Sequence, residues 1–210
     1  MKKLLILSAM MITLIACNKN DNPLLVEQNT PYGVPAFDKI KLEHYKPAFD
    51  AAIQAYRDEV AAITDNEEAP TFQNTIAALD RSGSLLARVE GVFFNLLETD
   101  GNDEMNALAE EVMPLLSECT DETLLNEKLF ARVKAVYDQR ESLDLTPEQL
   151  RLTEECYKCY VLNGANLEQA AKERLKEINR ELGLLSLKFG QNVVAETNAV
   201  QHFVTDEAEL

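Results

Sequence analysis

The helical fold of this chain is clearest in the stretch NEKLFARVKAVY, residues 126–137. Its first residue, Asn126, is a type that caps helices well, because the side chain accepts a hydrogen bond from an early backbone N–H. The apolar residues that follow recur every three or four positions, which is the period of one helix face. This pattern predicts a helix over residues 129–140 with four inward side chains: Phe130, Val133, Val136 and Tyr137.

The same period recurs along the rest of the chain and predicts an all-α fold. One apolar stripe starts at Phe49, and we place Pro47 in the first turn of that helix, where a missing N–H costs nothing. Asn102 or Asp103 is expected to start a later helix. Pro114 is expected to kink or break that helix, because proline removes a backbone donor and clashes with the preceding turn.

Capping residues mark the ends of two further helices. Thr71 is expected to cap a short helix that Gly83 ends. The run Thr146-Pro147-Glu148-Gln149 combines a capping box with proline at the first helical position. The helix that starts there is expected to run to Asn163-Gly164, a favourable C-terminal stop.

The longest predicted helix opens at Asn166. It carries an apolar seam at alternating spacings of three and four, typical of a coiled coil: Ala171, Leu175, Ile178, Leu182, Leu185, Phe189 and Val193. Gly183 and Gly190 weaken it, and we interpret them as points of close helix packing rather than a hinge. Glu168 and Lys172 are expected to form an i,i+4 pair on its outer side.

The pattern changes after this helix. Gln201-His202-Phe203-Val204-Thr205 alternates polar and apolar residues and could form an edge strand. No repeat of 20 to 50 residues stands out, so a repeat solenoid is a weak alternative to a single helical domain.

The N-terminus has the pattern of a lipoprotein signal. Lys2-Lys3 precede a short apolar run, which Leu14-Ile15-Ala16-Cys17 ends as a lipobox. We expect residues 1–16 to be removed, Cys17 to carry lipid, and residues 17–30 to form a flexible tether before a helical domain over residues 31–210. An ordinary cleaved signal and an uncleaved anchor are the alternatives. Asn18, where an inner-membrane retention signal usually has Asp, favours the outer membrane, facing the periplasm or the cell surface.

The chain is strongly acidic, with a formal net charge of −16. This charge argues against nucleic acid as a partner, because binding a phosphate backbone requires a basic surface. It also argues against electrostatic adhesion to anionic lipid headgroups, so the lipid must supply the anchor. A well-solvated protein surface explains the charge without any substrate preference.

Cys156-Tyr157-Lys158-Cys159 has the spacing of a redox or metal motif. Such a site needs a preceding strand or a second pair of Cys or His ligands, and the sequence supplies neither. We interpret these as ordinary helical cysteines, with redox or metal chemistry as the alternative. With Cys17 lipidated, Cys119 is the third free thiol, and whether it pairs with either neighbour depends on geometry.

Three other groups of residues could carry chemistry but have simpler explanations. The acidic clusters are expected to be solvated surface rather than acid–base pairs: Glu110-Glu111, Glu154-Glu155 and Asp65-Glu67-Glu68. His44 is expected at a helix boundary rather than in a metal site. Four aromatic residues are expected in the core rather than on a peptide-stacking platform: Phe93, Phe94, Tyr157 and Tyr160.

The block that begins at Asn126 and continues to Leu143 is too specific for composition to explain. Further stretches agree with the same family in the same order: residues 69–76 (APTFQNTI), 81–83 (RSG), 92–97 (VFFNLL), 164–167 (GANL) and 206–210 (DEAEL). Together they resemble the thimet oligopeptidase and oligopeptidase A family of zinc metallopeptidases, especially its Dcp-type peptidyl-dipeptidases. The resemblance covers residues from about Thr30 to Leu210.

The resemblance implies a nearly all-helical enzyme whose two halves flank a narrow channel for short peptides. The zinc and its ligands would lie in the C-terminal half, and the N-terminal half would form the opposite wall. Such a site needs a His-Glu-x-x-His motif. This chain has only His44 and His202, so no catalytic residue and no metal ligand is assigned to it, and it is expected to be inactive alone.

Two functions remain open from the sequence. The first is an N-terminal fragment of a lipid-anchored zinc peptidyl-dipeptidase, whose missing half supplies the catalytic site and whose substrates are short peptides. The second is a free-standing helical lipoprotein that binds peptides or a protein partner without catalysis. The first predicts exposed apolar surface where the missing half would pack.

Overall fold

The computed structural model describes residues 22–27, 29–201, 203 and 208. In these residues it contains helices and turns but no strand, so the all-α prediction is confirmed. The α-helices are α1 (Leu42–Thr64), α2 (Ala77–Arg81), α3 (Ser84–Asp100), α4 (Asp103–Leu124), α5 (Glu127–Gln139), α6 (Pro147–Leu162) and α7 (Gln169–Ala199). Three short helical turns join them: η2 (Pro31–Gly33), η3 (Phe72–Ile76) and η4 (Arg140–Ser142).

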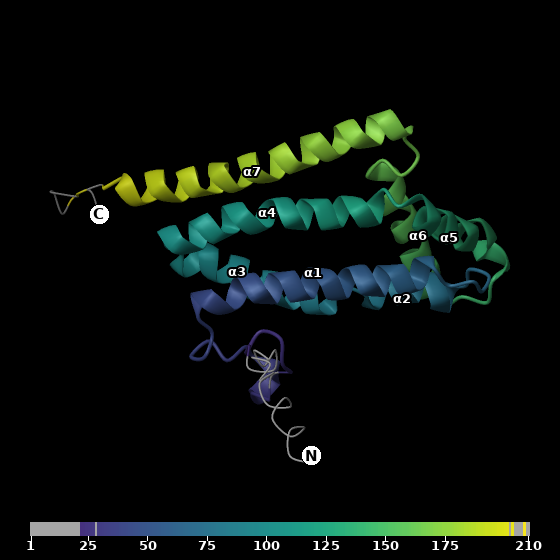
Figure 1. Cartoon of the computed structure of the whole chain (residues 1–210), viewed down its shortest axis with the longest axis horizontal. Coiled ribbons are helices and arrows are strands. Elements are labelled where there is room, and N and C mark those ends of the chain that lie inside the picture. Colours follow the sequence, from purple (N-terminus) through teal and green to yellow (C-terminus); the bar gives the residue numbers. More distant parts are fainter. Residues whose placement is uncertain (1–21, 28, 202, 204–207, 209–210) are drawn as a thin grey trace, which may run out of the picture.

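Three long helices, α1, α4 and α7, lie side by side with α4 in the middle (Figure 1). Helix α3 packs on α1 at one end of this layer, and a core forms there around Phe49 and Phe93, whose rings meet edge to face. At the other end, α5, α6 and η3 enclose a second core around Ile76, Leu129 and Val133. The helix period read from the sequence therefore places its apolar faces correctly in α1 through α6.

The predicted capping residues hold the helix starts as expected. In each case a side-chain oxygen accepts a hydrogen bond from a backbone N–H three residues on: Thr71 from Asn74, Asn102 from Met105, Asn126 from Leu129, and Thr146 from Gln149. Gly83, between α2 and α3, has a left-handed backbone (φ 74°) that favours glycine. These signals could be read from the sequence because capping is local.

Two prolines differ from what the sequence predicts, one in its position and one in its effect on the helix. Helix α1 starts at Leu42, so Pro47 lies inside it rather than in its first turn. The earlier start is fixed by His44, whose Nδ1 accepts a hydrogen bond from the backbone N–H of Lys41 at 3.0 Å. Pro114 lies within the continuous helix α4, so the predicted break is wrong. Packing of neighbours such as Val112, which is fully buried, offsets the lost hydrogen bond.

The described part of the predicted tether is packed onto the helices. Leu24 is buried in the core formed by α1, α3 and α4. The side chain of Asn22 donates to the carbonyl of His44 at 2.7 Å, and Arg88 Nη2 donates to the carbonyl of Leu24 at 3.1 Å. Burial of Leu24 explains why this segment leaves solvent before the first helix. Cys17 lies outside the described residues.

The last helix also differs from its prediction. It starts at Gln169 rather than Asn166, because residues 163–167 form a turn in which Gly164 has φ 93° and the Leu167 N–H donates to the Gly164 carbonyl. Of the predicted edge strand only Gln201 and Phe203 are described, and neither lies in a strand. Within the residues given above, no helix is both long and apolar enough to cross a membrane.

Candidate functional site

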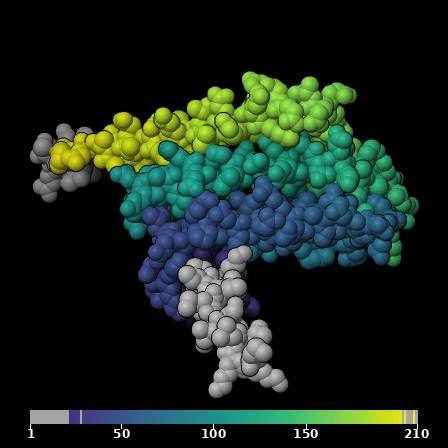
Figure 2. Space-filling view, viewed as in Figure 1, coloured from purple at the N-terminus to yellow at the C-terminus, as the bar shows by residue number. Residues whose placement is uncertain are grey.

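The face formed by α4 and α7 is the candidate functional site. Helix α7 lies antiparallel to α4 as the outermost layer along one edge of the molecule (Figure 2). Two hydrogen bonds join these helices: Asn179 Nδ2 donates to Asp121 Oδ1 at 2.7 Å, and Gln191 Nε2 donates to Asn106 Oδ1 at 3.1 Å. At the start of α7, Lys172 Nζ also lies 3.0 Å from Glu127 Oε1, the first residue of α5. The interface therefore depends on specific polar pairs as well as on apolar packing.

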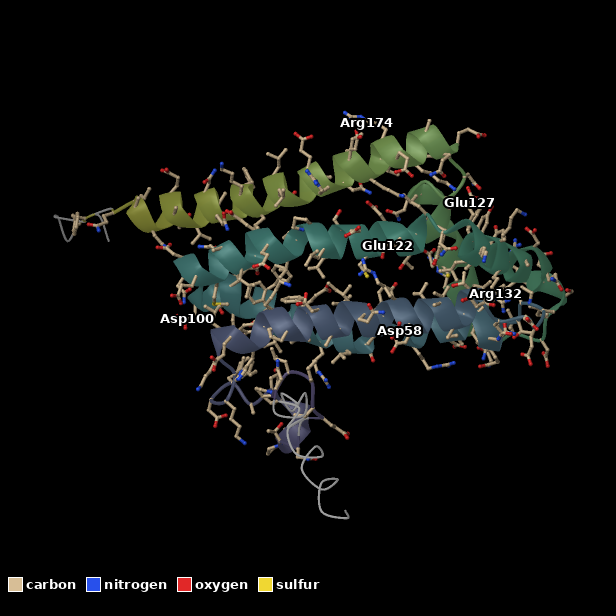
Figure 3. The ribbon with its side chains drawn as sticks, viewed as in Figure 1. Asp58, Asp100, Glu122, Glu127, Arg132 and Arg174 are labelled. Carbon is tan, nitrogen blue, oxygen red and sulfur yellow. The ribbon has the colours of Figure 1, made fainter. Side chains whose placement is uncertain are left out.

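Lys172 lies on the inner side of α7, which overturns its expected position on the outside with Glu168. Its side chain is buried and pairs with Glu127 at the start of α5, just beyond the end of α4 (Figure 3). Glu168 is the N-cap residue of α7 instead. The long aliphatic stem of lysine allows this burial, because the stem packs while the ammonium reaches a carboxylate.

The apolar seam of α7 is exposed, although its spacing matches the prediction. Five of its side chains retain between 43% and 71% of their accessible surface: Ile178, Leu182, Leu185, Phe189 and Val193. These five residues are called the α7 stripe below. Leu175, nearer the start of the helix, is only half-buried. Among the described residues, none of the stripe packs against either hydrophobic core, although Leu185 borders the groove between α4 and α7.

The two glycines of α7 have different surroundings. A Cβ at Gly183 would lie 3.5 Å from Met113 Cε on α4, which is ordinary contact distance, so close packing is confirmed there. A Cβ at Gly190 would meet no atom within 4 Å, so the packing interpretation is wrong for Gly190 within this chain.

A groove of about 1130 Å³ follows the junction of α4 and α7. Its floor is apolar and includes Pro114, Leu115 and Leu184. Its rim is acidic, with six carboxylates and two cations: Glu118, Asp121, Glu122, Glu173, Glu177, Glu181, Lys176 and Arg180. The groove can therefore accommodate an apolar group flanked by positive charge, but it contains no histidine or thiol for acid–base or nucleophilic catalysis.

A second, shallower groove of about 570 Å³ lies between α1 and the junction of α4 with α5. Arg57 Nε and Glu122 Oε2, 2.6 Å apart, bridge α1 and α4 at its edge. The hydrogen bond to Glu122 is the main reason that the pKa of Arg57 is raised. This pair neutralises the only arginine in the groove lining, so the groove offers no free anion-binding group of that type.

The three thiols within the described residues are all free. Burial raises the pKa of Cys119, and it raises the pKa of Cys156 to about 12. Cys159 is exposed. A reactive or metal-binding thiol needs a lowered pKa, so the surroundings of the buried Cys119 and the half-buried Cys156 are those of inert thiols.

The remaining candidates from the sequence lie on surfaces or in cores. His44 caps the start of α1, and the acidic clusters lie exposed or half-exposed, where Glu154 pairs with Arg140 and Glu155 with Arg151. Tyr160 and Phe93 are buried, and Phe94 and Tyr157 are half-buried beside other rings. Core packing is confirmed for these four aromatic residues.

The described residues do not fit a zinc site. No three His, Cys, Asp or Glu side chains among them come together as metal ligands require. His202 lies outside the described part of the chain, and His44 Nδ1 is already occupied as a hydrogen-bond acceptor.

Sequence reasoning missed Arg132, which is buried on the inner side of α5. Its Nη1 donates to the carbonyls of Asn66 and Glu68, and its Nη2 donates to Asn74 Oδ1 at 3.2 Å. It thereby ties the loop after α1 to η3 (Figure 3). The burial of Arg132 could have been predicted from the sequence. Arg132 stands three residues after Leu129 and four before Val136, which places it on the apolar side of the helix.

Known proteins with similar sequences are peptidases. The chain is 44% identical over 189 residues to dipeptidyl carboxypeptidase of Escherichia coli (strain K12), which is 90% of this chain and 28% of that protein. It is 43% identical over 178 residues to dipeptidyl carboxypeptidase of Salmonella typhimurium, covering 85% of this chain and 26% of that protein. Oligopeptidase A of Escherichia coli is 28% identical over 189 residues, 90% of this chain and 27% of the relative. No protein-family model matches the chain. The chain thus spans between a quarter and a third of the length of these relatives.

Proposed function

Since this chain is homologous to the N-terminal part of peptidases of the thimet oligopeptidase family, we propose that it is the N-terminal portion of one such enzyme. The complete enzyme would be a zinc-dependent peptidyl-dipeptidase that releases dipeptides from the C-terminus of short peptides. This portion would form the wall of the substrate channel opposite the zinc and would limit the size of the substrate. Its own residues would perform no step of peptide hydrolysis.

The observation that supports this proposal most directly is the exposure of the α7 stripe. Five large apolar side chains in helical register on one face are typical of a packing surface rather than of a solvated helix. The relatives are more than three times as long as the matched region, so they contain ample chain to cover such a face. In the complete enzyme the stripe would pack against the catalytic portion.

A lipid on Cys17 would attach this enzyme to a membrane, with the outer membrane favoured by Asn18. The lipobox that ends at Cys17 supports this part of the proposal. The lipid would be needed because the acidic surface is repelled by anionic headgroups.

The proposal is tested by measuring dipeptide release from a short peptide with a blocked N-terminus, in the presence of zinc. The chain alone is expected to release none. The second sample is a mixture of the chain with the C-terminal region of Escherichia coli dipeptidyl carboxypeptidase, from which the matched part has been removed. The two are expected to form a complex with chelator-sensitive activity. Release by the chain alone, or failure of the two parts to bind, would count against the proposal.

Matched variants make the binding test specific for the α7 stripe. Leu182→Gln combined with Leu185→Gln is expected to abolish complex formation while leaving the chain folded, because both side chains are already exposed. Lys188→Gln, at an exposed position of α7 outside both the stripe and the groove lining, serves as the control and is expected to bind normally. A chain that binds short peptides by itself but never binds the catalytic region would favour the free-standing lipoprotein instead.

A further inference from the structure

Residues 30–37, called the N-terminal loop below, carry a second exposed apolar surface. Tyr32 is 102% exposed, Val34 48% and Phe37 46%. The loop projects below α1, on the opposite side of the molecule from α7 (Figure 1). It is therefore separate from the α7 stripe.

The backbone holds Tyr32 outward in a defined turn. The Gly33 N–H donates to the Thr30 carbonyl at 3.1 Å, and the Thr30 hydroxyl donates to the Val34 carbonyl. Tyr32 itself has φ 62°, in the left-handed region that bulky residues rarely adopt. The ring of Tyr32 packs against no other described residue, although its backbone is strained. A strained residue that is fully exposed points to a partner outside the chain.

The position of the loop identifies that partner. Asn22 is fixed to α1 by its hydrogen bond to the His44 carbonyl, and it follows Cys17 by five positions. Five residues span at most about 17 Å, so a lipid on Cys17 would hold this side of α1 against the membrane surface. Tyrosine is favoured at that depth, because its ring packs among apolar groups while its hydroxyl stays hydrated.

The charges next to the loop permit this approach. Lys39 and Lys41 follow it closely, and Asp38 and Glu43 balance them, so this part of the surface is nearly neutral although the whole chain is strongly acidic. A neutral patch with exposed apolar side chains approaches a bilayer without the repulsion that the rest of the surface would meet.

We propose that the N-terminal loop inserts Tyr32, Val34 and Phe37 into the interfacial layer of the bilayer that holds the lipid anchor. This inference rests on the proposed lipidation of Cys17. The loop would act as a second contact beside the lipid and would fix the orientation of α1 on the membrane. The second contact would add buried apolar area to that of the lipid.

The test uses the absence of tryptophan from the chain. Tyr32→Trp places a single fluorescent reporter in the loop, and Phe189→Trp places a matched aromatic reporter on the α7 stripe. Each full chain, purified with its lipid, is reconstituted into phosphatidylethanolamine–phosphatidylglycerol vesicles with brominated acyl chains. The emission of Tyr32→Trp is expected to shift to the blue and to be quenched by the bromine, whereas that of Phe189→Trp is expected to stay unchanged.

The outcomes separate the loop from the anchor. If the chain floats with vesicles but Tyr32→Trp is not quenched, the loop proposal is wrong while the anchor stands. If the chain does not float, both are wrong. Equal quenching of the two reporters would mean that the protein adheres to the vesicles unspecifically. A blue shift of Tyr32→Trp that grows with protein concentration in the absence of vesicles would mean that the loop contacts a second copy of the chain. Either result would overturn the loop proposal.

Discussion

Lys172 Nζ lies 3.0 Å from Glu127 Oε1, and the lysine side chain is only 4% exposed whereas the glutamate is 75% exposed. The pair joins the first turn of α7 to the first turn of α5. The negative charge of Glu127 also lies at the N-terminal end of α5, where the helix dipole favours it. One carboxylate thus stabilises both a helix start and the attachment of another helix.

Removing that carboxylate should weaken the attachment of α7. Glu127→Gln is expected to lower the free energy of unfolding by about 1 kcal/mol, a value discounted for the exposure of the glutamate, because Lys172 would remain buried without its partner. Lys172→Met is expected to be nearly neutral, because the apolar stem is replaced and the charge is removed. Glu173→Gln, which breaks an exposed pair with Lys176, is the control in urea unfolding. Equal urea midpoints for Glu127→Gln and Glu173→Gln would show that the pair of Lys172 with Glu127 does not stabilise the attachment of α7.

The burial of Leu24 makes a residue before the first helix part of the core. Leu24→Ala is expected to destabilise the chain by about 2–4 kcal/mol, the range for removing a buried leucine side chain. Val34→Ala, ten residues on and half-exposed, should change stability by less than about 0.5 kcal/mol. Thermal unfolding of both variants measures the difference. If this segment were a free tether with Leu24 in solvent, Leu24→Ala and Val34→Ala would unfold at the same temperature.

The thiols should differ in reactivity in the folded chain. Cys159 is exposed, whereas burial raises the pKa of Cys119 and raises that of Cys156 to about 12, so both stay protonated at pH 8. A maleimide reagent is therefore expected to label Cys159 first and the other two only after unfolding. The same shifts predict stability lost at strongly alkaline pH, where the buried thiols would have to ionise. Cys159→Ser should abolish the fast phase, and a fast phase that persists would locate the reactive thiol elsewhere.

Burial raises the pKa of Glu90, a half-buried residue on α3. A raised pKa means that folding favours the protonated carboxyl, so Glu90 stabilises the chain at low pH and costs stability once the pH rises through its folded-state pKa. Glu90→Gln is therefore expected to be more stable than the parent at pH 7, with the difference vanishing near pH 4. Glu98→Gln, toward the end of the same helix, is the control. If the unfolding midpoints of Glu90→Gln and the parent do not converge as the pH falls from 7 to 4, the assigned direction of the Glu90 pKa shift is wrong.

Local features were predicted well because their causes lie within a few residues. Thr71, Asn126 and Thr146 cap their helices through bonds to a neighbour three positions away, and a reader of the sequence needs nothing else to place them. The break that was one of the two predicted effects of Pro114 is absent for the opposite reason. Whether a proline breaks a helix depends on how firmly the flanking residues pack, and that packing comes from distant α1 and α3.

The candidate site was predicted only in part. The seam of α7 could be read from its period, but the period alone does not say which surface of the helix is buried. Here α7 contacts the rest of the chain through Asn179 and Leu187, neither of which belongs to the seam. The inward position of Lys172 could not be read, because it depends on Glu127 at a separation of 45 residues. The lipidated Cys17 and zinc binding by the missing half stay predictions.

The N-terminal loop and the α7 stripe lie on opposite sides of the layer formed by α1, α4 and α7. Neighbouring helix axes in such a layer are about 8–10 Å apart, so α7 stands nearly 20 Å above α1. With the loop at the bilayer, α4 would act as a spacer between the anchored side and α7. The α7 side of the molecule would then lie toward the solvent, beyond the headgroup layer.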